Sequence, residues 1–94
     1  MSDVRWPTDE GMDVVGYRLE LVDPTDAILQ EIRGGEATRK DIARTYALLI
    51  RDYWHQVNWP VVNRAIVERW SRSALEYIKR RAWAIVAGRL AFDA

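Results

Sequence analysis

The sequence predicts a mostly α-helical protein in which a three-helix C-terminal bundle follows a short helix and an extended segment. Two observations support this fold class. Apolar residues recur at helical spacing through residues 39–88, and capping residues, prolines or glycines stand where helices should begin or end. The predicted bounds are about 24–33 for the short helix, about 39–54, 60–70 and 74–88 for the bundle, and 14–22 for the extended segment.

The extended segment is predicted from alternation, because Val15, Leu19 and Leu21 alternate with polar residues or glycine. A lone strand leaves its backbone groups unpaired, so its partner would be residues 4–6 or a second subunit. A short helix is the alternative, and Gly16 weighs against it.

Helix starts are marked by residues that accept hydrogen bonds from the first turn. The predicted pairs of cap and first-turn residue are Asp23 with Pro24, Thr38 with Asp41, Asn58 with Pro60, and Ser73 with Glu76. The expected buried core consists of Ile42, Tyr46, Leu49, Ile66, Leu75, Ile78 and Ile85.

The 94 residues suffice for one domain, which we place at 14–94 after a flexible polar arm at 1–13. The chain has no cysteine, which excludes a disulfide scaffold and a thiolate metal site. Its first residues lack the basic and apolar regions of a signal peptide, and no apolar run approaches the ~20 residues that span a membrane. We therefore expect a cytoplasmic protein without membrane contact.

Residue types that perform catalysis are scarce. His55 is the single histidine, and no sequence pattern places an orienting partner beside it. Gly34 and Gly35 lack the lysine and serine of a phosphate-binding loop and are interpreted as a helix stop. We therefore expect no enzyme activity, no cofactor and no catalytic or metal site.

Charge is uneven although the net charge is zero. Residues 1–33 carry eight acids and three arginines, whereas residues 64–94 carry seven bases and three acids. This asymmetry indicates either a basic binding face or attraction between the two ends of the fold.

The segment 61–81 can be aligned with a helix-turn-helix template through Ala65, Trp70, Leu75 and Ile78. Arg69 stands where that template has the turn glycine, and we expect it to strain the turn. A DNA-binding regulator is therefore the alternative function, and a plain helical hairpin explains the same pattern.

Five tryptophans and four tyrosines exceed what so small a core easily buries. Because tryptophan, tyrosine and arginine are enriched at binding hot spots, the leading prediction is a non-enzymatic protein-binding module that self-associates as a homo-oligomer. The candidate partner-binding residues are Trp54, Trp83, Arg72, Tyr77, Arg80 and Arg81.

One stretch also carries a family resemblance. It begins with Thr-Arg-Lys-Asp-Ile-Ala at Thr38, continues through Trp59-Pro60 and Arg69-Trp70-Ser71, and ends at Ala82-Trp83. This stretch resembles small uncharacterised helical proteins encoded by bacteriophages and prophages. The resemblance implies a phage-related origin and carries no site, activity or partner.

Overall fold

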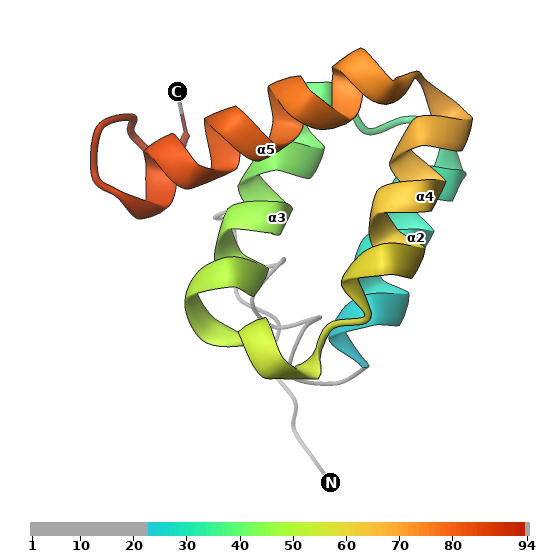
Figure 1. Ribbon diagram of the computed structural model, residues 1–94, viewed down its shortest axis with the longest axis horizontal. Helices are drawn as coiled ribbons and strands as arrows, with labels where there is room; N and C mark the ends of the chain where they lie inside the picture. Colours follow the sequence, from blue (N-terminus) through green and yellow to red (C-terminus); the bar gives the residue numbers. More distant parts are fainter. Residues whose placement is uncertain (1–22, 94) are drawn as a thin grey trace, which may run out of the picture.

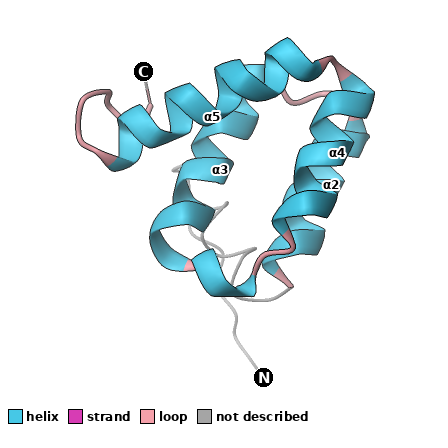
Figure 2. Ribbon diagram, viewed as in Figure 1, coloured by secondary structure: helices cyan, strands magenta, loops and turns pink. Residues whose placement is uncertain are grey.

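A computed structural model describes residues 23–93, and within this range every regular element is helical (Figures 1 and 2). The elements are α2 (Pro24–Gly34), α3 (Arg39–Asp52), the 3₁₀ turn η1 (Trp54–Gln56), α4 (Trp59–Arg69) and α5 (Arg72–Val86). The mostly α-helical fold class is therefore confirmed. The predicted arm at 1–13 and extended segment at 14–22 lie outside the described residues.

The helices pack as two pairs that share one core. Helix α2 lies beside α4 on one side of the molecule, and α5 crosses over α3 on the other (Figure 1). Contacts of α2 with α3 and of α4 with α5 join the pairs. The backbones of α3 and α4 stand further apart, and side chains bridge them: Tyr46 of α3 reaches Asn63 and Trp59 of α4.

The core is a cluster of mainly aliphatic side chains, to which all four helices of the described range contribute. Those that are fully buried are Ile28, Ile32, Ile42, Leu49, Val62, Ile66 and Ile78. Every residue of the expected core is buried except Ile85, which is partly buried. The end of α5 that carries Ile85 extends beyond the other helices (Figure 1), so fewer neighbours cover it.

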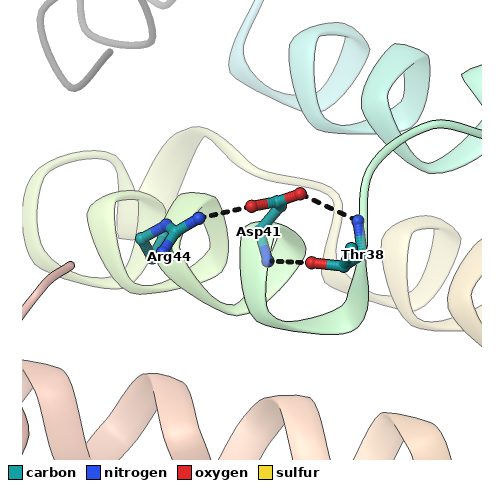
Figure 3. Close-up of polar contacts among 3 residues, drawn as sticks. All are labelled: Thr38, Asp41 and Arg44. Atoms are coloured by element: carbon teal, nitrogen blue, oxygen red, sulfur yellow. Dashed lines mark hydrogen bonds and ion pairs between the residues drawn. The ribbon is translucent and has the colours of Figure 1, made fainter. Parts of the chain in front are cut away.

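Three of the four predicted helix starts are confirmed. The Asp23 carboxylate accepts a hydrogen bond from the Thr25 N–H at 2.8 Å. At α3, the Thr38 hydroxyl accepts from the Asp41 N–H at 3.1 Å, while the Thr38 N–H donates to the Asp41 carboxylate at 2.9 Å (Figure 3). The Asn58 side chain accepts from the Val61 N–H at the start of α4.

The two reciprocal bonds between Thr38 and Asp41 form a capping box, and Figure 3 also shows that its Asp41 carboxylate forms an ion pair with Arg44, one turn further along α3. The backbone hydrogen bond from Thr38, and then the nearby Arg44 charge, lower the pKa of Asp41 below its usual range, although partial burial opposes this. The ionised Asp41 carboxylate supports the N-terminus of α3, where the helix dipole favours a negative charge.

The predicted start of the last helix was wrong. Ser71, and not Ser73, caps α5: its backbone is extended, and its hydroxyl accepts from the Ala74 N–H at 3.1 Å. Because α4 ends at Arg69, the chain is already extended at Ser71 and α5 begins two residues earlier than predicted. The spacing of Ser73 to Glu76 imitates a capping box inside the first turn of α5. Helix α5 also ends earlier than predicted, at Val86 instead of residue 88, and α3 ends at Asp52 instead of residue 54.

The cap assignment can be tested with a matched pair of serine variants. Ser71→Ala should lower the free energy of unfolding by about 1 kcal/mol, because the first turn of α5 loses its hydrogen-bond acceptor. Ser73→Ala should change it by less than about 0.5 kcal/mol, because the exposed Ser73 hydroxyl bonds to the Ser71 hydroxyl at 3.1 Å and does not cap the helix. Urea denaturation measures both values, and an equal loss for the two variants would contradict the assignment.

Candidate protein-interaction surface

A row of four aromatic rings runs from the core to the surface and joins four elements. Tyr46 of α3 lies with its ring centroid 4.8 Å from that of Trp59, at the start of α4. Trp59 lies 5.2 Å from Trp54 of η1, and Trp54 lies 6.1 Å from Trp83 of α5. The rings are tilted against one another, an arrangement that aromatic pairs favour because it sets ring edges against ring faces.

The inner half of this row is structural. Tyr46 is buried, and its hydroxyl donates to the Asn63 side-chain oxygen at 2.7 Å. The Trp59 indole N–H donates to the backbone carbonyl of Trp54 at 3.1 Å, so it holds η1 against the start of α4. Burial raises the pKa of Tyr46 to about 12, because the charged phenolate would lose its hydration in the core.

The outer half is open to solvent. Trp54 is 45% exposed and Trp83 46% exposed, and within residues 23–93 only Val61, at 37%, is another exposed large apolar residue. Both tryptophans were predicted from the sequence as partner-binding residues, but no pattern in the sequence places them together. The structure brings them into contact because α3 ends at Asp52 and η1 turns the chain, so that Trp54 meets the side of α5.

Two of the predicted arginines share a surface with this pair. Arg72 and Arg80 are exposed, and helical spacing puts them on the same side of α5 as Trp83. Glu76, which the sequence predicted as the cap partner of Ser73, lies between them and is exposed on the same side. We call the surface formed by Trp54, Arg72, Glu76, Arg80 and Trp83 the α5 face.

The other two candidates, Tyr77 and Arg81, lie to one side of the α5 face. Both are partly buried, and Tyr77 faces the start of α3, where the Arg39 guanidinium lies 5.9 Å from its ring centroid. Tyr77 also lines an open depression of about 560 Å³ with Thr38, Arg39, Lys40, Ser73 and Ala74. The six candidates therefore divide into four on the α5 face and two on its flank.

Arg69 does not strain the turn between α4 and α5, contrary to the sequence-based expectation. It is the last helical residue of α4, and in the described part of the chain only glycines have a positive φ. Its guanidinium donates to the carbonyls of Ile32 and Gly35, each at 3.1 Å, and lies 4.1 Å from the Trp70 ring centroid. Arg69 therefore satisfies carbonyls at the C-terminal end of α2 and ties this helix to α4.

Within residues 23–93 there is neither a candidate metal site nor a membrane-spanning helix. No three His, Cys, Asp or Glu side chains of this range lie together as a metal site would require. His55 is exposed in η1. None of the helices described is long and apolar enough to cross a membrane.

Comparison with known proteins does not assign a family. No protein-family model matches the chain, and no match was found among curated proteins or solved structures. The resemblance to phage-encoded proteins stays a prediction, and function has to be inferred from the surface itself.

The raised pKa of Tyr46 predicts how stability depends on alkaline pH. An unfolded tyrosine loses its proton near pH 10, whereas folded Tyr46 keeps it until about pH 12. Its contribution is therefore complete below about pH 10 and falls above it by about 1.4 kcal/mol per pH unit. Urea denaturation at about pH 9 and pH 11 should show a larger loss for the wild type than for Tyr46→Phe. Equal losses would contradict the burial argument.

Proposed function

We propose that this protein is a non-enzymatic protein-binding module that also self-associates, and that Trp54 and Trp83 form the centre of its contact surface. The observation that supports this most directly is the pairing of two nearly half-exposed indole rings from different elements. The proposal includes the cytoplasmic location and the phage-related origin that we expect from the sequence.

The tryptophan pair offers substantial binding energy. A tryptophan buries about 150–250 Å² when it is covered, and each of these rings is nearly half exposed. Covering both would remove on the order of 200 Å² of apolar surface from water, which is worth roughly 5 kcal/mol at about 25 cal/mol per Å². This is the gross gain before the entropy cost of association is subtracted.

The pair is also held in place before a partner arrives. Trp54 rests on Trp59, whose indole N–H bonds back to the Trp54 carbonyl, and Trp59 rests on buried Tyr46. A side chain with little freedom to lose pays less entropy on binding. Arg80 and Arg72 on the same face add the second residue type that is enriched at hot spots.

Specific DNA binding is the second candidate, and the hairpin of α4 and α5 favours it. The helices are separated at Trp70 and Ser71, and α5 exposes Arg72 and Arg80 on one side, as a recognition helix would. Two features weigh against it. The turn is shorter than the three or four residues usual in such motifs, and Glu76 lies between the arginines, where it would repel phosphates.

The proposed surface predicts the effect of removing either indole. Wild-type protein should be dimeric at micromolar concentration, and Trp54→Ala or Trp83→Ala should weaken the dimer about tenfold or more, because the pair loses one of its rings. Sedimentation equilibrium measures the dissociation constants. Val61→Ala, which removes a similarly exposed apolar side chain outside the α5 face, is the control and should leave the dimer unchanged. A wild-type monomer at about 100 μM would contradict self-association.

The DNA alternative predicts a salt-dependent complex, and we expect no binding above the non-specific level at about 150 mM salt. Gel-shift titrations with a pool of random duplexes measure this directly. The opposite result would be a sequence-specific shift with submicromolar affinity that Arg72→Ala with Arg80→Ala abolishes while the helical circular dichroism is kept. That result would replace protein binding by DNA recognition as the proposed function.

A further inference from the structure

The exposed side of α5 carries charges in an ordered pattern. Arg72, Glu76, Arg80 and Trp83 follow one another at spacings of four, four and three residues, so they form a single stripe along the helix. The opposite side of α5 is buried through Ala74, Leu75, Ile78 and Ala82. Along the stripe the order is therefore cation, anion, cation and indole.

This order is self-complementary in one orientation only. If two copies of α5 packed in parallel about a twofold axis, Glu76 would face Glu76 and Arg80 would face Arg80. If the helices packed antiparallel with the axis near Ile78, Glu76 of each copy would face Arg80 of the other. In the same register Trp83 of one copy lies beside Arg72 of the other. Shifting the axis by two residues in either direction would place like charges opposite each other.

We infer that the α5 face binds a second copy of this chain, with the two α5 helices antiparallel across a twofold axis near Ile78. This inference rests on the proposed self-association and specifies its geometry. Two symmetry-related Glu76–Arg80 ion pairs flank the axis, and at each end Arg72 of one copy covers the Trp54–Trp83 pair of the other. Lys79, at the edge of the face, is a second cation near the Glu76 of the other copy.

The contact between arginine and tryptophan has a precedent within the chain itself. The Arg69 guanidinium lies 4.1 Å from the centroid of the Trp70 ring, and Arg39 lies 5.9 Å from that of Tyr77. Guanidinium groups favour such positions because the ring face is negative and because they are weakly hydrated. An exposed Arg72 on one copy and an exposed indole pair on the other provide the same chemistry between subunits.

The size of the face predicts a weak dimer. Helix α5 has 15 residues, which corresponds to a length of roughly 22 Å. One helix and the adjacent Trp54 cover less than the ~800 Å² per partner of a standard interface, so dissociation constants should be micromolar. Ion pairs between exposed side chains contribute modestly to affinity but strongly discriminate between orientations, because the wrong orientation sets like charges together.

Reversing the two charges separately tests this geometry. Glu76→Arg alone and Arg80→Glu alone each place like charges opposite each other at both symmetry-related positions. Each variant should therefore dimerise at least about tenfold more weakly than the wild type at low salt. An equimolar mixture of the two variants should dimerise again, because each variant then supplies the charge that the other now requires. Sedimentation equilibrium, with one variant fluorescently labelled, measures all three dissociation constants.

Two controls accompany the charge reversals. Arg64→Glu makes the same change on the exposed side of α4 and should leave dimerisation unaltered. Glu76→Gln removes the attraction without adding repulsion, so it should weaken the dimer less than Glu76→Arg does. Because all these side chains are exposed, each variant should keep the wild-type circular dichroism.

The outcomes separate this inference from the proposed function. Weak single variants whose mixture recovers the wild-type dissociation constant would support the antiparallel pairing. Single variants that dimerise like the wild type, or a mixture that stays as weak as its components, would overturn the pairing. In either of those cases the Trp83→Ala result decides separately whether the indole surface binds a partner. A wild-type monomer would overturn both the pairing and the self-association.

Discussion

The shortness of its helices is the constraint on which this fold depends. The helices have between 11 and 15 residues, and isolated helices of that length are marginal in water. Each therefore depends on burying its apolar side against the others. The fully buried residues come from all four helices of residues 23–93, so none of these helices can be removed without exposing part of a neighbour. Local caps such as Thr38 with Asp41 lower the cost of starting each helix but do not replace the shared core.

Two sets of contacts hold the exposed residues in place on this core. Arg69 satisfies carbonyls at the end of α2 from the last turn of α4 and stacks on Trp70, where the chain turns towards α5. In the aromatic row, buried Tyr46 packs against Trp59 and Trp59 packs against Trp54, so Trp54 is supported from the core. As a result, the exposed indoles lie on a backbone that is held on both sides, which suits recognition by shape.

The chemistry of the α5 face supports the proposed protein partner over a nucleic acid. A phosphate backbone selects a surface of one sign, because each cation that approaches it releases counterions. The α5 face instead alternates in sign and ends in two indoles, a pattern that complements a surface of the same composition in reverse order. The Glu76 carboxylate thus distinguishes the two proposed partners, because it would repel the phosphates of DNA and attract an arginine of a protein.

The sequence by itself determined the helices, three of their four caps, and six of the seven residues that we predicted to be buried. These features could be predicted because their signals are local: apolar spacing repeats within a few turns, and a cap bonds to the backbone two or three residues away. Only the tertiary structure decided that Ser71 and not Ser73 caps α5, because the end of α4 sets where the chain becomes extended. It also decided that Trp54 meets Trp83 and that Arg69 reaches Gly35. These pairs lie far apart in the chain, and their contact depends on how the helices pack, which no local pattern records.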